Sequence, residues 1–175
     1  MCNMKEAILI TGMSGTGKST LGEYLRNRGY VVYDIENIPE MFTTTDIRTG
    51  AVVTEWDVNN PDEIKHLFFE CNKNKLADII KQEQNTPSFY CGTATNITEI
   101  IPLFSKVILL QASPDVIRHR LSTRTTHDFA RSPGMQEWII EIKKPFEDSV
   151  IEGGAIVVNA DGIVEETAEK VLREV

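Results

Sequence analysis

The sequence predicts an α/β fold in which helices lie on both faces of a parallel sheet. Five short, continuous apolar runs recur along the 175-residue chain, as expected of strands that are buried on both faces. Helix patterns follow these runs, and strands that alternate with helices pair in parallel through right-handed crossovers. The pattern therefore predicts a three-layer arrangement. The expected strands are residues 7–11, 31–33, 88–91, 107–110 and 155–158.

The first helix is expected over residues 18–28, because Gly29 stands where helices commonly stop. A strand at 31–33 follows it. Residues 35–60 are polar, rich in threonine and irregular, apart from a short extended piece at 51–53. This stretch is the least regular part of the chain.

A long helix is expected over residues 60–84. Asn60 is a good N-cap, Pro61 suits the first helical position, and Asp62 places an acid in the first turn. Pro87 lies beyond its end. The later helices are expected at residues 97–104, at 113–124, around Trp138 up to Gly153, and at 163–174, with a polar break at 125–134.

Composition is ordinary for a soluble globular protein, with 41% hydrophobic and 25% charged residues. We find no linker, repeat or low-complexity tract, so residues 1–175 are expected to form one domain. No apolar run reaches the roughly 18 residues of a membrane span. Residues 1–6 are too short and polar to precede a secretory signal. These features predict a cytoplasmic protein that does not associate with membranes.

The formal net charge of −8 argues against general nucleic-acid binding, which usually needs a basic surface. Cys2, Cys71 and Cys91 lack metal-ligand spacing and would leave one thiol unpaired. Free thiols in a reducing compartment are therefore expected. Cys91 lies in an apolar run and is interpreted as a small buried hydrophobe.

A glycine-rich turn from Gly12 to Ser19 matches the pattern G-x-x-x-x-G-K-[ST] between a strand and a helix. Its glycines let backbone N–H groups turn inward around a phosphate, and the helix N-terminus adds positive partial charge. Lys18 is expected to reach the β- and γ-phosphates, and the Ser19 hydroxyl suits Mg²⁺. The loop predicts binding of ATP with Mg²⁺ through Gly12, Met13, Ser14, Gly15, Thr16, Gly17, Lys18, Ser19 and Thr20.

Two acids, Asp34 and Glu36, follow the second strand, where ligands bind in open α/β sheets. Asp34 is expected to orient a magnesium-bound water or the nucleophile, and Glu36 to bind the phosphate acceptor. A solvated acidic loop is the alternative. The third strand ends in Gly92-Thr93 and lacks the terminal Asp usual in P-loop ATPases, which shifts metal binding toward Asp34.

Four arginines flank the polar residues 125–130. Planar guanidinium groups bind a transferring phosphoryl group well, and arginines on a mobile loop can close over a nucleotide. Arg124 and Arg131 are expected to be catalytic, while Arg120 is expected to contact the nucleotide, with stacking on adenine as one mode. The alternative is a solvated basic helix face. His127 is a lone histidine, and a catalytic role for it is not favoured. The arginines are Arg118, Arg120, Arg124 and Arg131.

With these residues in place, the chain resembles the nucleoside monophosphate kinase and shikimate kinase branch of P-loop proteins. The resemblance spans nearly the whole chain in element order, and the phosphate loop is its specific motif. It implies a P-loop NTPase fold with five parallel strands in order 2-3-1-4-5. It also implies an acceptor-binding region at about residues 37–85 and a lid at about 121–133.

Shorter matches accompany this resemblance. The stretch Asp34-Ile35-Glu36 resembles the Asp-x-Asp of shikimate kinases, and Gly92-Thr93-Ala94 replaces their triple glycine, with Asn96 close behind. Gly92, Thr93 and Asn96 are therefore expected to contact the acceptor. Asn159-Ala160 resembles the loop that faces the adenine ring. Trp56-Asp57 and residues 93–96 are similar to uncharacterised kinase-like ATPases.

We expect a kinase that moves the γ-phosphate of Mg-ATP to a small molecule, working as a monomer or homodimer. Between residues 37 and 72 the basic candidates for binding a phosphate are Arg48, Lys65 and His66, a scarcity that favours a neutral or hydroxyl acceptor. The alternative is a regulatory or assembly ATPase whose slow hydrolysis depends on a protein or RNA partner. A nucleotide binder without turnover is a third, weaker interpretation.

Overall fold

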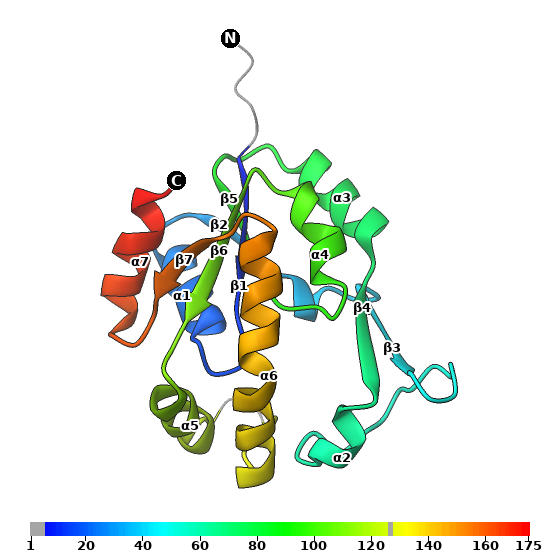
Figure 1. Ribbon diagram of the computed structural model, residues 1–175. Coiled ribbons are helices and arrows are strands. Elements are labelled where there is room, and N and C mark those ends of the chain that lie inside the picture. Colours follow the sequence, from blue (N-terminus) through cyan, green and yellow to red (C-terminus); the bar gives the residue numbers. More distant parts are fainter. Residues whose placement is uncertain (1–5, 126–127) are drawn as a thin grey trace.

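A computed structural model describes residues 6–125 and 128–175. Its main sheet has five strands in the order β2-β5-β1-β6-β7, and every neighbouring pair is parallel (Figure 1). The pleat directs successive side chains to opposite faces of this sheet. The strands are β1 (Ala7–Thr11), β2 (Val31–Asp34), β5 (Ser88–Cys91), β6 (Lys106–Gln111) and β7 (Ile156–Asn159).

These five segments have the spatial neighbours that the resemblance implied. Their numbers read 2-5-1-6-7 instead of 2-3-1-4-5, because two unexpected strands precede β5 in the chain. These are β3 (Phe42–Asp46) and β4 (Leu67–Cys71), which form a separate antiparallel pair. This second, two-stranded sheet was not predicted from the sequence.

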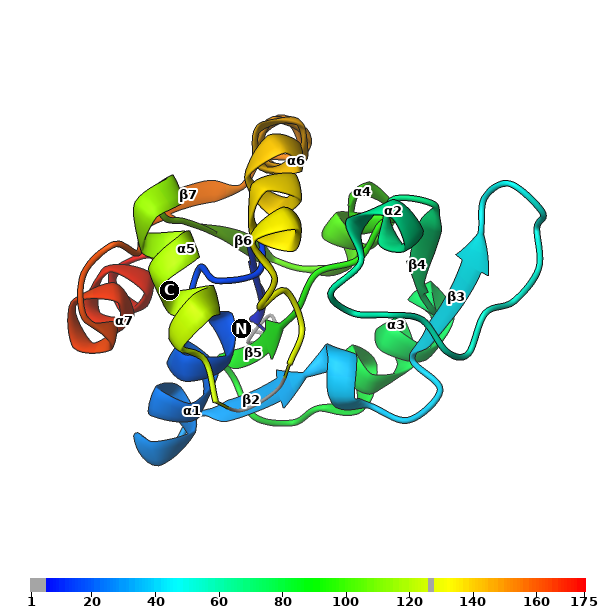
Figure 2. The same cartoon turned by 90° about the horizontal axis from the view of Figure 1, so that it is seen from below.

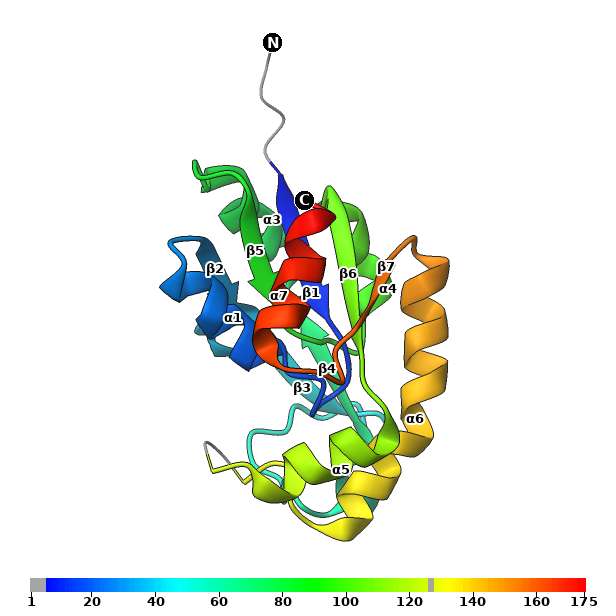
Figure 3. The same cartoon turned by 90° about the vertical axis from the view of Figure 1, so that its left-hand side faces the viewer.

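Helices cover both faces of the main sheet (Figures 1 and 3). Ile8 and Ile10 of β1 pack in a hydrophobic cluster with residues of α1 (Lys18–Asn27) and α7 (Val164–Arg173). Leu9 packs on the opposite face with residues of α3, α4 and α6. All five β1 side chains are buried, which explains why the run reads as continuously apolar. The helices on the face that Leu9 occupies are α3 (Lys73–Gln82), α4 (Ile97–Ile100) and α6 (Pro133–Glu152).

The single helix expected over residues 60–84 is interrupted: its first turn and residues 73–82 are helical as expected, but residues 67–71 between them form a strand. Asn60 does cap a helix, since its side chain accepts a hydrogen bond from the Asp62 N–H at 3.0 Å, but α2 (Pro61–Ile64) is short. β4 follows, and then α3. Phe68 and Phe69 suit a strand when a partner strand is available, and β3 supplies that partner. Pairing with a distant segment has overridden the local helical pattern.

We call residues 42–71, which contain β3, α2 and β4, the arm; it projects to one side of the main sheet (Figure 2). The remaining short elements are η1 (Ile35–Asn37), η2 (Ile101–Leu103) and α5 (Pro114–Thr123). Gly29 follows α1 with φ 89°, so the expected helix stop is confirmed. Within the ranges that the structure describes, no helix is both long and apolar enough to cross a bilayer.

Cys71 and Cys91 are free, buried thiols. Burial raises the pKa of the Cys91 thiol to about 12 and that of Cys71 to about 11. Both thiols therefore stay protonated, as expected of small buried hydrophobes. Cys2 lies outside the described residues.

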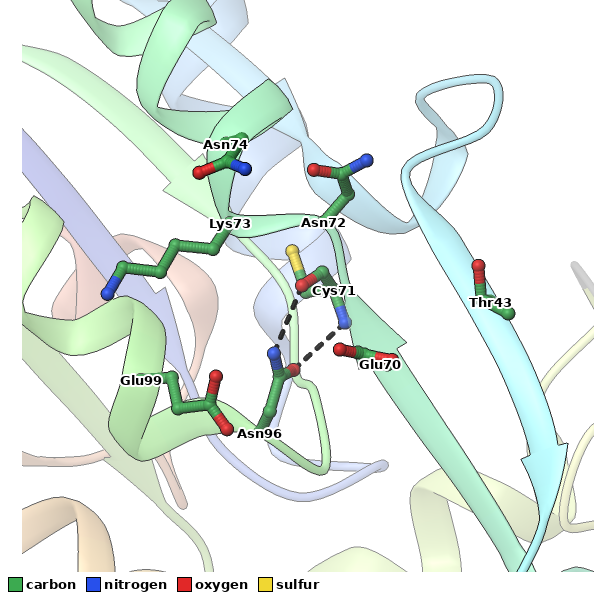
Figure 4. A pocket seen from close by; sticks show the side chains of 8 residues that line it. All are labelled: Thr43, Glu70, Cys71, Asn72, Lys73, Asn74, Asn96 and Glu99. Carbon is green, nitrogen blue, oxygen red and sulfur yellow. Dashed lines mark hydrogen bonds between the residues drawn. The ribbon is translucent and has the colours of Figure 1, made fainter. Parts of the chain in front are cut away.

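The loop after β5 attaches the arm to the main sheet. The Asn96 amide accepts a hydrogen bond from the Cys71 N–H at 2.9 Å and donates one to the Cys71 carbonyl at 3.0 Å (Figure 4). The Phe69 N–H donates to Thr95 Oγ1 at 3.0 Å, and the Thr95 N–H donates to the Phe69 carbonyl at 2.9 Å. Asn96 is buried. Its amide is engaged by the arm backbone, and its expected contact with an acceptor stays a prediction.

An open polar pocket of about 390 Å³ lies beside this attachment (Figure 4). Lys73 and two acids, Glu70 and Glu99, are part of its lining. The mixed charges give it no clear preference for an anion or a cation.

We predict that Asn96→Ala destabilises the protein, because it leaves the N–H and C=O of buried Cys71 without their partner. Each unsatisfied buried group costs about 1–3 kcal/mol. Urea unfolding followed by tryptophan fluorescence measures the loss, and Thr98→Ala, at an exposed position on α4, is the control. An Asn96→Ala midpoint equal to that of the control would show that this attachment contributes no stability.

Candidate active site

The loop from Gly12 to Ser19 joins β1 to α1. Gly12, Gly15 and Gly17 have φ values of 150°, 87° and 100°, in the region that favours glycine. A Cβ on Gly12 would lie 2.6 Å from the Leu110 carbonyl oxygen. No side chain caps α1 at Gly17, so the helix presents its first N–H groups toward the loop. This is a backbone cradle of the kind that binds phosphate.

The Lys18 ammonium lies over this cradle. Its Nζ donates hydrogen bonds to the Gly12 carbonyl at 2.7 Å and the Met13 carbonyl at 3.3 Å. Burial lowers the pKa of Lys18 below its ordinary value, and the Glu36 carboxylate opposes this shift while the Arg124 guanidinium adds to it. Lys18, Glu36 and Arg124 are therefore electrostatic neighbours.

Thr93 connects the loop to the acidic segment after β2. Its hydroxyl donates to the Gly12 carbonyl at 2.7 Å, and its N–H donates to Glu36 Oε1 at 2.8 Å. A Cβ on Gly92 would lie 2.3 Å from Ile35 Cγ1, so only glycine lets η1 approach this closely. In this structure Gly92 and Thr93 position Glu36 beside the loop, and contact with an acceptor remains a prediction.

The two expected carboxylates both lie at the carboxyl end of β2. Asp34 Oδ1 accepts from the Glu36 N–H at 3.2 Å and Oδ2 accepts from Asn37 Nδ2 at 2.8 Å, so Asp34 caps η1. Asp34 also acts, more weakly than Glu36, to raise the pKa of Lys18. Glu36 is exposed, whereas Asp34 is half-buried. The structure thus brings both acids close to the phosphate cradle.

The four arginines separate into different environments. Arg124, just after α5, is half-buried; burial lowers its pKa, and Glu36 opposes that shift. Arg131 pairs with Asp128 at 2.8 Å and donates to the Arg124 carbonyl. Arg118 of α5 forms an ion pair with Glu137 of α6 at 2.8 Å, so its guanidinium connects these two helices. Thr126 and His127 lie outside the described residues.

Arg120 links the phosphate loop to the loop after β7. Its Nη1 donates to the Thr16 carbonyl at 3.2 Å, and its Nη2 donates to the Ala160 carbonyl at 2.8 Å and to Gly162 at 3.1 Å. The expected contact with adenine is therefore accompanied by a structural role. Asn159, the last residue of β7, is exposed, and Ala160, which follows it, is buried.

Asn59, which the sequence did not predict to be a site residue, has three side-chain hydrogen bonds to residues 128–132. An asparagine ahead of a helix start is normally read as a cap, and the neighbouring Asn60 already fills that role. Local sequence therefore carried no separate signal for Asn59.

A family model described as an AAA domain (AAA_18) matches residues 8–137. The match spans the phosphate cradle, both carboxylates, the arm and the arginines. The chain belongs to this AAA domain family.

Relatives of this AAA-domain chain include kinases. A nucleotide-binding protein of Coprothermobacter proteolyticus is 27% identical over 144 residues; they cover 79% of this chain and 42% of that longer protein. Dephospho-CoA kinase of Streptococcus mutans is 25% identical over 184 residues, covering 89% of this chain and 92% of the kinase. The solved shikimate kinase of Bacteroides thetaiotaomicron has a TM-score of 0.60 at 17% identity, with 97% and 99% of the two chains covered. This structural likeness shows a shared fold.

We predict that Arg120→Lys weakens Mg-ATP binding and lowers the free energy of unfolding by about 1–3 kcal/mol, because lysine cannot bridge both loops. Calorimetric titration and urea unfolding measure the two effects. Arg118→Lys is the matched control, since its ion pairs are exposed, and we expect wild-type values for it. Equal losses in the two variants would show that the bridge by Arg120 has no special importance.

Proposed function

We propose that this protein is a kinase that transfers the γ-phosphate of Mg-ATP to a hydroxyl group of a small molecule. The observation that carries this proposal is a set of hydrogen bonds that holds Glu36 beside Lys18: the Gly12 carbonyl accepts from Lys18 Nζ and Thr93 Oγ1, and the Thr93 N–H donates to Glu36 Oε1. Arg124 is an electrostatic neighbour of both Lys18 and Glu36. Two cations and a carboxylate at that place supply charge stabilisation and a proton acceptor together. The kinases among its relatives support the same reaction class.

The residues present fit a nucleoside triphosphate. A Cβ would obstruct the cradle at Gly12 and strain it at Gly15 and Gly17, and Lys18 would hold the phosphates with the loop amides of residues 13–20. Magnesium would be held by the Ser19 hydroxyl, with Asp34 as a second oxygen donor. Among residues 6–125 and 128–175, no cluster of three or more His, Cys, Asp and Glu side chains could hold a metal. Phosphate oxygens would therefore complete the magnesium site.

Bound Mg-ATP supplies the phosphoryl group and a leaving group. Negative charge spreads over the phosphoryl oxygens as the group moves, and guanidinium groups stabilise it. We assign this role to Arg124, and its electrostatic interaction with Lys18 and Glu36 supports the assignment. Arg131 supports it by donating to the Arg124 carbonyl. Arg120, Asn159 and Ala160 would lie on the base side of the nucleotide.

Glu36 would take the proton from the attacking hydroxyl. The Thr93 N–H orients its carboxylate through Oε1, and Thr93 is in turn bonded to the cradle at Gly12. This arrangement would hold the proposed base in a fixed position relative to phosphates bound in the cradle. Correct orientation of the base and the reacting group supplies much of the rate enhancement in such reactions.

The acceptor is proposed to be an uncharged hydroxyl compound. Two of the cations on the arm are engaged by nearby acids, because Arg48 pairs with Asp46 and Lys65 pairs with Asp62. The arm also carries Trp56, which packs edge-to-face on Phe69 with ring centroids 5.5 Å apart. Both rings pack on the hydrophobic cluster that contains Met13 of the cradle. An apolar wall of this kind suits a ring-bearing alcohol better than a phosphate.

We predict that Lys18→Ala lowers acceptor-dependent ADP release at least a hundredfold, because Lys18 acts on the phosphates that become charged in the transition state. ADP release is measured with Mg-ATP and a panel of nucleosides, nucleoside monophosphates, sugar acids, shikimate and simple alcohols. Lys144→Ala, which removes an exposed ion pair with Asp148, is the control. A slow rate that no acceptor changes would favour an ATPase that needs a protein or RNA partner.

We predict that Glu36→Gln lowers kcat by about a hundredfold or more while leaving the Kd for Mg-ATP nearly unchanged, because the amide cannot accept the proton. Steady-state kinetics and calorimetry separate the two quantities. Glu23→Gln, exposed on α1, should match the wild type. Wild-type kcat in Glu36→Gln would remove Glu36 from the reaction.

A further inference from the structure

The arm and the segment that precedes α6 are joined by a seam of hydrogen bonds. We call residues 128–132 the bridging segment. The Ala130 N–H donates to the Val58 carbonyl at 3.2 Å, and the Ser132 hydroxyl donates to the Asn59 carbonyl at 2.7 Å. The two sides are far apart in sequence, so this seam depends on the tertiary fold.

The Asn59 side chain is the centre of the seam. Its Oδ1 accepts from the Arg131 N–H at 2.8 Å and the Ser132 N–H at 3.0 Å, and its Nδ2 donates to the Asp128 carbonyl at 2.9 Å. One amide therefore serves three backbone groups of the bridging segment. No other residue type of this size offers a donor and a two-fold acceptor in the same geometry.

The local structure of the arm does not need this amide. Asn60 caps α2, and the Asn59 N–H donates to Asp57 Oδ1 at 2.9 Å through the backbone alone. The bridging segment, in contrast, is held on several sides. Buried Gln136 donates to the Arg131 carbonyl at 3.0 Å, and Ala130 is buried with φ 61°, an unfavourable conformation that its surroundings must hold.

The bridging segment leads to the active site through Arg131. Its guanidinium pairs with Asp128 at the start of the segment and donates to the Arg124 carbonyl. Arg124 is an electrostatic neighbour of Glu36 and Lys18. A continuous set of contacts therefore runs from Asn59 through Arg131 to the arginine that faces the phosphate cradle.

We propose that Asn59 is a positioning residue for phosphoryl transfer, which sets Arg124 against Glu36 and Lys18 by fixing residues 128–132 to the arm. The proposal rests on the kinase function proposed above. Asn59 acts through Arg131 and is not itself a catalytic residue. Because the arm is also the proposed acceptor region, the same amide ties the place where the acceptor binds to the arginine that stabilises the transferring group.

Kinetics of Asn59→Ala test this role. We expect kcat for acceptor-dependent ADP release to fall about tenfold to a hundredfold, since small misplacements of catalytic groups have effects of this size. The Kd for Mg-ATP should stay within about twofold, because the cradle is untouched. Asn59→Asp keeps the acceptor for the Arg131 and Ser132 N–H groups and should recover part of the lost kcat. Wild-type kcat in Asn59→Ala would overturn the proposal.

Asn60→Ala is the matched control. It removes the neighbouring asparagine, which caps α2 and has no hydrogen bond to residues 128–132 among the described contacts. We expect it to lower Tm as Asn59→Ala does but to leave kcat within about twofold of the wild type. An equal loss of kcat in both variants would mean that Asn59 only stabilises the arm.

Hydrogen exchange separates this proposal from the kinase assignment. In Asn59→Ala, amides of Arg131 and Ser132 should exchange faster, while those of residues 12–19 should keep their wild-type rates. If the wild type transfers no phosphate to any acceptor but this exchange pattern is found, the kinase function fails and the seam stands. Unchanged exchange at Arg131 and Ser132 would overturn the seam whatever the activity.

Discussion

The close approach of three backbone segments at the carboxyl edge of the sheet is the constraint on which the site depends. The Gly12 carbonyl accepts from both Lys18 Nζ and Thr93 Oγ1, each at 2.7 Å. This contact requires that Gly12 lie against β6 and Gly92 against η1, where a Cβ would meet Leu110 or Ile35. Two positions without side chains therefore align the cradle, its lysine and the Glu36 carboxylate. The sheet supports this alignment because β1 is buried along its whole length and pairs with β5 on one side and β6 on the other.

Much of this framework was predictable from the sequence, because its signals are local. The motif from Gly12 to Ser19 lies between β1 and α1 as expected, and the five parallel strands occupy nearly the expected residues. The start of α2 at Asn60 and the end of α1 before Gly29 both follow from the capping preferences of single residues. The positions of Asp34 and Glu36 followed from a general rule, that ligands bind where parallel strands end.

The arm was not predictable, because its structure is decided by contacts between distant residues. The run around Phe68 fits a helix face as well as a strand, and only pairing with β3 decides between them. The hydrogen bonds by which Asn96 holds Cys71 could not be inferred from its place after β5. Asn59 and Arg120 likewise have their partners on other loops, so neither residue's main contacts could be inferred from its neighbours in sequence.

The fate of the γ-phosphate tests the central claim most directly. The protein is incubated with Mg-ATP labelled in the γ-phosphate and with each candidate acceptor, and the label is then divided between inorganic phosphate and organic phosphate by chromatography. A hydroxyl-directed kinase places the label in a new phosphate ester and forms ADP in equal amount. Label found only in inorganic phosphate, with every acceptor, would contradict the account and identify the protein as a hydrolase.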